Sequence, residues 1–285
     1  MKEIIIEREL SSEEIKDIRK LIVDAASNID SSSGKRLKLS DINCSKELLD
    51  KIIFDKRGFY KEIFDELGKL MSKIDFDGVS FDRALIHGRD FTGSKGVKIN
   101  PQTIYGKKLN RTKFTGVKFI GPFDYAEISG ANFTGSKGAK INPQTIWFGD
   151  LSNTVCSGVK FIGPFHDARI SGANFTGSKG AEINPQTIFF KSLSNTVCSG
   201  VEFIGPFDDA RISGANFTGS KGAKINPQTI CGKNLLGTIC ADVKFTGSFD
   251  DVKMNDETSL DGSNARYIDI DSCERVKKSI KKLIK

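Results

Sequence analysis

The residue types that carry out most enzymatic chemistry are scarce in this chain. Only two histidines occur in 285 residues, His87 and His166. His166 stands where other copies of an internal repeat have Asp124 or Asp208, which is typical of a surface substitution. The sequence contains no GxSxG, HExxH or GxGxxG motif and no phosphate-binding loop. We therefore expect no catalytic residues, no cofactor and no metal site, and we predict that the protein is not an enzyme.

Aromatic residues that follow a recurring QTI tripeptide are the main binding candidates. The two residues after QTI are aromatic in two copies, whereas in the other two copies the second is glycine. We predict an outward-facing aromatic column that binds a partner protein, because exposed aromatic patches often mark interfaces. The alternative is that the rings stack on one another or lie under a neighbouring loop. The predicted column consists of Tyr105, Trp147, Phe148, Phe189 and Phe190.

Lysines recur at fixed places in the same repeat. A first row of four occurs once per copy, and a second row lies three residues further on, where Glu182 interrupts it. Stacked copies would place these lysines in a ridge with a spacing of about 9.6 Å. The ridge is either a solvated edge that prevents edge-on association or a dock for an acidic partner or polyanion. The first row is Lys95, Lys137, Lys179 and Lys221, and the second contains Lys98, Lys140 and Lys224.

The elements that must position these residues are copies of one repeat. The segment SGANFTGSKGAKINPQTI at 129–146 returns without change at 213–230, and with Glu182 as its one change at 171–188. A partial copy begins at Phe91, and the asparagines of the recurring Asn-Pro pair follow one another at intervals of 42 residues. A fixed period in this range indicates a solenoid or an array.

Within the 42 residues, large apolar residues recur mostly every five positions, with one step of eight and one of four. Five is neither a helical nor a strand period, and it suits a chain that makes a quarter-turn every five residues. The centres of one copy are Phe207, Ile212, Phe217, Ile225, Ile230, Leu235, Cys240, Phe245 and Phe249. The residues two positions before many centres are small or β-branched, and include Ala210, Ala215, Ala223, Thr238 and Val243.

The segments ANFTG, ARISG and VKFIG resemble the pentapeptide-repeat family over residues 76–271. This resemblance implies a mainly β fold, a right-handed quadrilateral β-helix solenoid. Each 42-residue unit would be two coils with a three-residue bulge and a one-residue deletion. About nine coils would form a rod of roughly 45 Å.

Both ends of the predicted β-helix need a cover, because an open end exposes unpaired strand edges. Residues 1–75 form a predicted α-helical N-terminal region, and residues 272–285 form a predicted amphipathic C-terminal capping helix. In the first N-terminal helix, the apolar face includes Leu21, Ile22 and Ala25. Two further helices are predicted around Leu48–Ile53 and Phe59–Met71. The C-terminal helix is basic, so membrane binding is an alternative to capping.

The charge distribution and the cysteines indicate the cellular compartment and the class of partner that we expect. The net charge is +7, but residues 76–271 carry 22 basic and 19 acidic groups. This near-neutral region is unlike a nucleic-acid binder. We see no secretion signal or apolar run of membrane-spanning length, and the six cysteines form no CxxC pair. We therefore expect a bacterial cytoplasmic protein that binds neither nucleic acid nor membrane directly.

Three of the cysteines share one inward position of the repeat. Successive members would lie two coils or about 9.6 Å apart, which is too far for a disulfide. We interpret them as small apolar filler of the core. They are Cys156, Cys198 and Cys240.

These observations predict a shape more strongly than an activity. We expect a non-catalytic pentapeptide-repeat scaffold for protein–protein interaction, with the partner and the oligomeric state open. The family resemblance implies one alternative, a protein that interacts with DNA gyrase or topoisomerase and protects it from quinolones. Mimicry of DNA requires an acidic rod, so the near-neutral repeat region disfavours it. A second alternative is an accessory, effector-like β-helix module, but residues 1–75 carry no catalytic motif.

Overall fold

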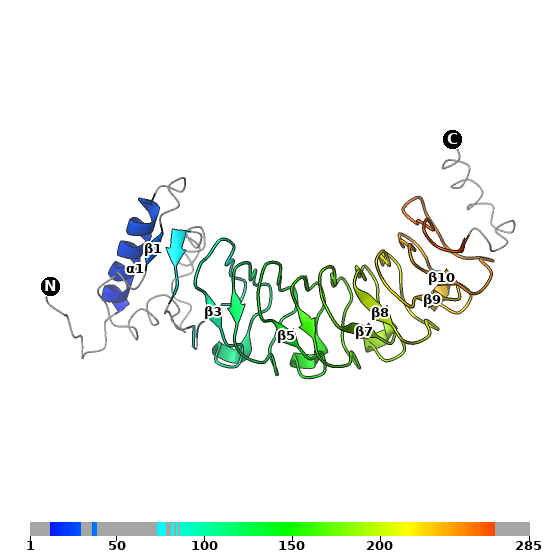
Figure 1. Ribbon diagram of the computed structural model, residues 1–285, viewed down its shortest axis with the longest axis horizontal. Coiled ribbons are helices and arrows are strands. Elements are labelled where there is room, and N and C mark those ends of the chain that lie inside the picture. Colours follow the sequence, from blue (N-terminus) through cyan, green and yellow to red (C-terminus); the bar gives the residue numbers. More distant parts are fainter. Residues whose placement is uncertain are drawn as a thin grey trace. The chain divides into compact units, whose positions relative to one another are not determined.

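The computed structural model describes residues 12–29, 36–38, 73–77, 81, 82, 84 and 86–265. The chain divides into two compact units, Met1–Ala139 and Lys140–Lys285. In the described residues, both units are mainly β repeat structure with short parallel strand pairs (Figure 1).

In the second unit, three strand pairs lie on one side of successive coils. β5 (Lys140–Ile141) pairs with β6 (Lys160–Phe161), β7 (Ala181–Ile183) with β8 (Val201–Phe203), and β9 (Lys224–Ile225) with β10 (Lys244–Phe245). All three pairs are parallel, and the paired residues are 20 positions apart in sequence. One coil therefore takes about 20 residues, which is four steps of five.

The other sides of the same coils are joined by isolated parallel bridges. Asp150 bridges Arg169 on one side, and Val155 bridges Asn174 on the next side. On the strand side, Lys160 bridges Lys179 in the next coil. The next pairing on this side begins three residues later, where Glu182 pairs with Glu202. The interval from 179 to 182 is the predicted three-residue bulge.

Apolar centres at the predicted spacing fill the interior of the coils. In the second unit, every centre of the first two coils has an exposed fraction of 3% or less. The small residues two positions before many centres, such as Thr154, Ala168 and Ala173, are also buried. This burial confirms the five-residue pattern of the core. The centres are Ile141, Ile146, Leu151, Cys156, Phe161, Phe165, Ile170 and Phe175.

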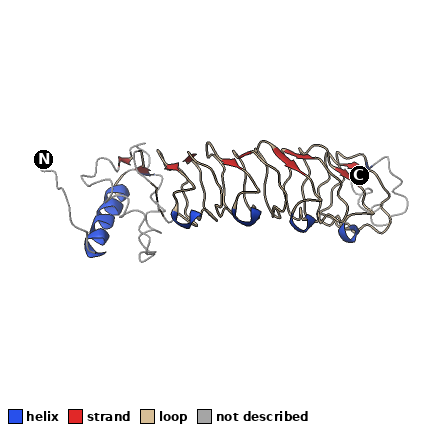
Figure 2. Cartoon of the chain, turned by 90° about the horizontal axis from the view of Figure 1, so that it is seen from below, coloured by secondary structure: helices blue, strands red, loops and turns tan. Residues whose placement is uncertain are grey.

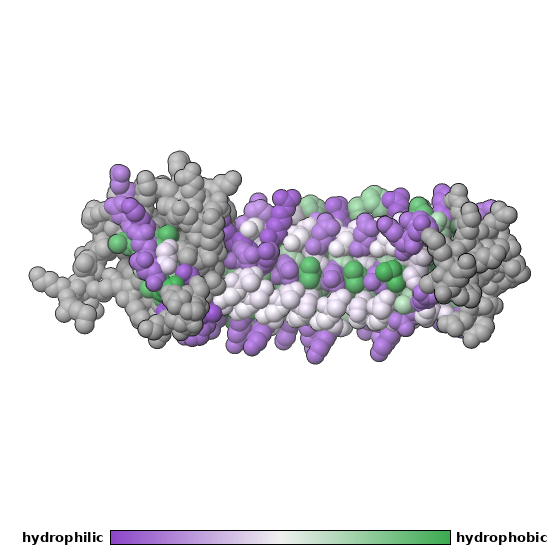
Figure 3. Space-filling model, turned by 90° about the horizontal axis from the view of Figure 1, so that it is seen from above, coloured by the Kyte–Doolittle hydropathy of each residue, from purple (hydrophilic) through white to green (hydrophobic). Residues whose placement is uncertain are grey.

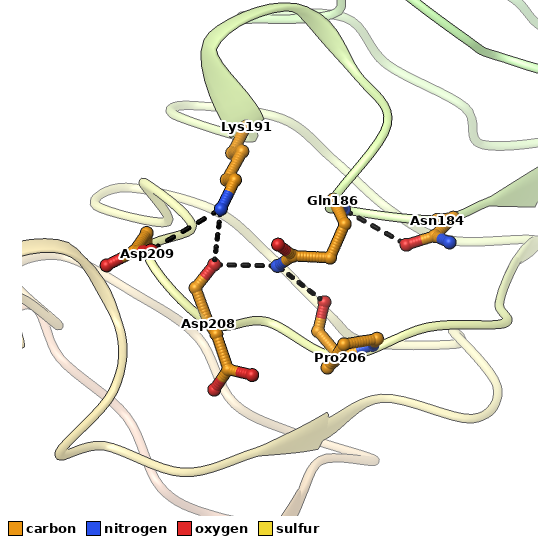
Figure 4. Close-up of polar contacts among 6 residues, drawn as sticks. All are labelled: Asn184, Gln186, Lys191, Pro206, Asp208 and Asp209. Atoms are coloured by element: carbon orange, nitrogen blue, oxygen red, sulfur yellow. Dashed lines mark hydrogen bonds and ion pairs between the residues drawn. The ribbon is translucent and has the colours of Figure 1, made fainter.

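On the fourth side, every second coil carries the Asn-Pro-Gln segment. The Asn184 Oδ1 atom accepts a hydrogen bond from the Gln186 backbone N–H at 3.0 Å. The Gln186 Nε2 atom donates to the carbonyl oxygens of Pro206, at 3.2 Å, and Asp208, at 2.6 Å, in the next coil (Figure 4). The motif thus shapes its own turn and links two coils, which gives its repetition a structural reason.

In its described residues, the first unit contains two strand pairs and the α-helix α1. β1 (Leu37–Lys38) pairs in parallel with β2 (Ile74–Asp75), and β3 (Lys98–Ile99) with β4 (Lys118–Phe119). A bridge between Asp75 and Lys95 joins β2 to the first copy of the repeat. A short N-terminal strand therefore lies on the outer edge of β2.

The helix α1 (Ser12–Ser27) buries part of the predicted apolar face. Ile22 and Ala26 are buried, whereas Leu21 is 66% exposed and Ala25 is exposed. The two buried positions are four residues apart and so lie on one face of the helix. Lys73 Nζ donates to the Ile29 carbonyl oxygen at 2.8 Å and holds the chain just beyond this helix.

Several predicted elements lie outside the described residues. These are the helices around Leu48–Ile53 and Phe59–Met71 and the C-terminal helix over 272–285. The boundaries 1–75, 76–271 and 272–285, and the capping role of the helices, stay predictions. In the described residues, no helix is both long enough and apolar enough to cross a membrane.

Candidate functional site

The predicted aromatic residues lie in tight turns at one corner of the coils. The turns are η4 (Tyr105–Lys107), η5 (Trp147–Gly149), η6 (Phe189–Lys191) and η7 (Cys231–Lys233). In Figure 2 the turns of the second unit lie along one edge of the coils, and its strands lie along the opposite edge. The corner is therefore remote from the strand side.

Each turn has a backbone that favours glycine at its centre. In η5 the Asp150 N–H donates to the Trp147 carbonyl oxygen at 3.1 Å, and the residues between them, Phe148 and Gly149, have φ of 50° and 60°. In η6 both central residues, Phe190 and Lys191, have positive φ, of 52° and 50°. A four-residue turn with positive φ at both centres is a type I′ turn, which glycine, asparagine and aspartate dominate.

Phenylalanine occupies a position that glycine occupies in the other copies. Gly106 and Gly232 stand at the place of Phe148 and Phe190, with φ of 59° and 64°. An L-residue in the left-handed region costs about 1–2 kcal/mol, because its Cβ crowds the backbone. The second unit therefore carries local backbone strain at two turns that a glycine would relieve.

The rings of these residues project from the turns. Phe148 is 71% exposed and Phe190 is 70% exposed. Each ring contacts its neighbour in the same turn, with centroids 4.9 Å apart for Trp147–Phe148 and 4.2 Å for Phe189–Phe190. The turns thus hold two aromatic pairs.

The first residues of the turns differ in their exposed fractions. Trp147 is 47% exposed, and Tyr105, in the first unit, is 48% exposed. Phe189 is half-buried, because the Arg169 guanidinium of the neighbouring coil lies 4.2 Å from its ring centroid. The guanidinium covers one face of the ring and leaves the Phe190 ring beside it exposed.

Tyr125 is an exposed aromatic residue that the sequence analysis missed. It is 66% exposed and has φ of 60°, at a place where the other copies have Asp167 and Asp209, each with φ of 57°. The Lys107 Nζ atom lies 5.3 Å from its ring centroid. The signal in the sequence was that tyrosine replaces aspartate at this position in one copy. The spacing of the apolar centres does not reveal this replacement, because the position is not one of the centres.

The first row of predicted lysines is exposed in both units, and it is denser than predicted. Lys95 forms an ion pair with Asp75 at 2.8 Å, which joins it to β2. Lys118 bridges Lys137, and Lys160 bridges Lys179, so a lysine lies in the coil directly before each of these two predicted members. Lys221 lies opposite Glu202.

The inward cysteines are buried filler in the described core. Burial raises the pKa of the Cys156 and Cys198 thiols well above the ordinary range, and raises the pKa of Cys240 to about 12. Cys231 lies in η7 and is exposed. In the described residues, no group of three or more histidine, cysteine, aspartate or glutamate side chains is arranged to hold a metal ion.

Comparisons with known proteins give a likeness among solved structures. No family model and no curated protein matches the chain. Among solved structures, the chain matches HetL, a pentapeptide repeat protein. HetL comes from the cyanobacterium Nostoc sp. strain PCC 7120 and is described as involved in heterocyst differentiation regulation. The match covers 67% of this chain and 86% of HetL, with 12% identity and a TM-score of 0.29.

Proposed function

We propose that the protein is a non-catalytic scaffold of the pentapeptide-repeat type, with a right-handed quadrilateral β-helix. Its partner is a protein that docks on the aromatic turns of the second unit. The repeated sequence, the burial of its five-residue centres and the bridges between coils support the fold proposal.

One observation carries the choice of surface. Phe148 and Phe190 are strained, and about 70% of each side chain is exposed, in turns where two other copies have glycine. Each of these rings contacts its neighbour in the same turn and is otherwise largely open to solvent. Strained positions of this kind cluster at binding sites, where a partner supplies the missing contacts.

The chemistry of the pairs suits a protein interface. Aromatic residues are enriched at the centres of interfaces, because they bury a large area with few rotatable bonds. The two pairs lie two coils apart, at a spacing of about 9.6 Å, so one partner surface can contact both. Arg169 holds one ring of the second pair in place.

The test is affinity capture from a bacterial lysate, followed by mass spectrometry. The aromatic variant is Phe148→Gly with Phe190→Gly, which restores the residue of the other copies. The control is Leu236→Ser, which removes an exposed apolar side chain that belongs to neither aromatic pair. We expect a partner that the parent and the control retain and the aromatic variant loses. Identical sets of captured proteins from all three would reject this surface, and captured topoisomerase subunits would favour the gyrase alternative.

A further inference from the structure

Lysines lie directly opposite one another on the strand side of the second unit. Lys140 pairs with Lys160, Lys160 bridges Lys179, and Lys224 pairs with Lys244. Successive coils are about 4.8 Å apart, so like charges face each other at the closest spacing that a parallel ladder allows. All five side chains are exposed, as is Lys221.

Other sides of the same coils do not stack like charges in this way. Asp150 faces Arg169, and Ser192 faces Arg211. Like charges directly opposite on neighbouring strands are destabilising, whereas opposite charges stabilise. The strand side therefore carries an unfavourable arrangement that the same fold avoids elsewhere. We call the lysines Lys140, Lys160, Lys179, Lys221, Lys224 and Lys244 the lysine ladder.

Exposed isoleucines lie beside the lysine ladder on the same side. Ile162 follows Lys160 by two residues, and its N–H continues the strand pairing to the Ile141 carbonyl oxygen at 3.0 Å. Ile204 follows Glu202 by two residues, and its N–H donates a hydrogen bond to the Ile183 carbonyl oxygen at 3.1 Å. Residues i and i+2 of a strand face the same way, so these side chains project beside the ladder. They are 58% and 60% exposed.

From this combination we infer that the strand side of the second unit adsorbs to the surface of an anionic lipid bilayer. The lysines interact with acidic headgroups, and the isoleucines enter the boundary between headgroups and acyl chains. The inference departs from the expectation of no membrane contact, which rested on sequence alone, and it does not depend on the aromatic turns.

A bilayer fits this side better than a soluble polyanion does. A nucleic acid or polyphosphate chain would engage the lysines, but it offers no apolar phase for the two exposed isoleucines. Proteins that bind single-stranded nucleic acids also place aromatic rings beside their cations. The described aromatic turns lie along the opposite edge of the coils (Figure 2).

Two glutamates interrupt the ladder and provide a gain-of-function test. Glu182 stands where the other copies have lysine, and it lies opposite Glu202, which replaces the lysine of the neighbouring copies. Each lysine near an anionic membrane contributes about a fivefold increase in binding. Glu182→Lys with Glu202→Lys should therefore strengthen adsorption by at least tenfold.

The experiment is co-sedimentation of the full-length protein with phosphatidylcholine vesicles, with and without phosphatidylglycerol. We expect binding only to the anionic vesicles, and weaker binding as salt is added. The loss variant is Lys140→Gln, Lys160→Gln and Lys179→Gln, for which we expect about a hundredfold loss. The control removes the same charge from other sides with Lys191→Gln, Lys233→Gln and Lys253→Gln. The basic residues of 272–285 are present in every variant, so differences report on the ladder.

The isoleucine variant Ile162→Ser with Ile204→Ser separates the bilayer from a soluble polyanion. We expect it to weaken adsorption to anionic vesicles several-fold and to leave binding to inorganic polyphosphate unchanged. The proposal is overturned if anionic vesicles bind no protein. It is also overturned if the loss and control variants are equally impaired, or if polyphosphate binds the protein and vesicles do not.

Discussion

The Gln186 side-chain amide donates to the Asp208 carbonyl oxygen at 2.6 Å, and so joins one coil to the next through a side chain (Figure 4). Gln102 and Gln228 make equivalent bonds in other copies. Each of these clamps joins two coils across their fourth side, on which no strand pair forms in the described residues.

The clamp predicts a measurable stability difference between two equivalent glutamines. Gln186→Ala removes two hydrogen bonds, and we expect it to lower the free energy of unfolding by about 1–2 kcal/mol. Gln144→Ala is the matched control, because within the described residues the Gln144 side-chain amide has no hydrogen-bond partner. Urea denaturation followed by circular dichroism measures both. Equal losses in the two variants would show that the amide bonds contribute nothing.

Much of the fold follows from the five-residue spacing of the sequence. The centres Leu151, Cys156 and Phe161 are buried as predicted, because each step of five turns the chain by one side and returns a side chain to the interior. The alignment of one coil against the next did not follow. That alignment depends on where the three extra residues of the bulge lie in the coil. Only the bridges between neighbouring coils show that Lys118 and Lys160 lie next to the predicted lysines.

The sequence predicted which residues form the candidate site, but it did not predict their backbone conformation. The sequence placed Trp147 and Phe148 outside the core, because they follow an inward centre. It did not predict that Phe148 and Tyr125 have left-handed backbones, since periodicity reports which way a side chain points and not the sign of φ. The glycine at 106 and 232 was the available signal.

Buried hydroxyl groups provide a second stability test. The Ser178 Oγ atom is buried and has no hydrogen-bond partner among the described residues, as is also the case for Ser136 and Ser220. Ser178→Ala removes an unpaired polar atom, so we expect the free energy of unfolding to rise by about 1 kcal/mol. In the matched control, Thr196→Val deletes a buried hydroxyl that donates to the Ile170 carbonyl oxygen at 3.0 Å, and it should be destabilising. A loss of stability in Ser178→Ala would point to a bonded hydroxyl.

The ion pair at the start of the repeats predicts a pH dependence. The hydrogen bond from Lys95 holds the pKa of Asp75 below its ordinary value of 3.8, although burial acts in the opposite direction. The ionised carboxylate therefore stabilises the fold at neutral pH, and this contribution is lost as the pH falls through the lowered pKa. We expect Asp75→Asn to lower the unfolding midpoint at pH 7, and we expect the difference to shrink as the pH falls below 3.8. A difference that does not shrink toward low pH would contradict the linkage.

The cysteines should differ in their reactivity. Burial protects the thiols of Cys156, Cys198 and Cys240 and raises their pKa, whereas Cys231 is exposed. Because the thiolate is the reactive form, we expect iodoacetamide at pH 8 to modify Cys231 in the native protein. The other three should react only after denaturant is added. Peptide mapping by mass spectrometry resolves each site, and rapid native labelling of Cys198 would contradict a closed core.

The strain at the aromatic turns can be separated from the ring contacts by comparing glycine with alanine. Phe148→Gly and Phe148→Ala both remove the ring and its contact with Trp147. They differ only in the Cβ atom, which is unfavourable at a φ of 50°. We therefore expect the glycine variant to be more stable than the alanine variant by about 1 kcal/mol, although glycine is ordinarily the less stable of the two in regular structure. The same order should hold at Phe190.

The natural copies provide the reverse comparison. Gly232→Ala introduces a Cβ atom at a φ of 64°, and no other atom lies within 4 Å of it. Any loss of stability in this variant therefore comes from the unfavourable backbone conformation and not from steric crowding. We expect a loss of about 1 kcal/mol in urea denaturation, equal to the glycine–alanine difference at position 148. If alanine is as stable as glycine at both places, the turns are unstrained, and the exposure of Phe148 and Phe190 alone would have to support a binding surface. If glycine is favoured at both, the two phenylalanines are retained against the stability of the fold, which is the condition that the proposed partner site requires.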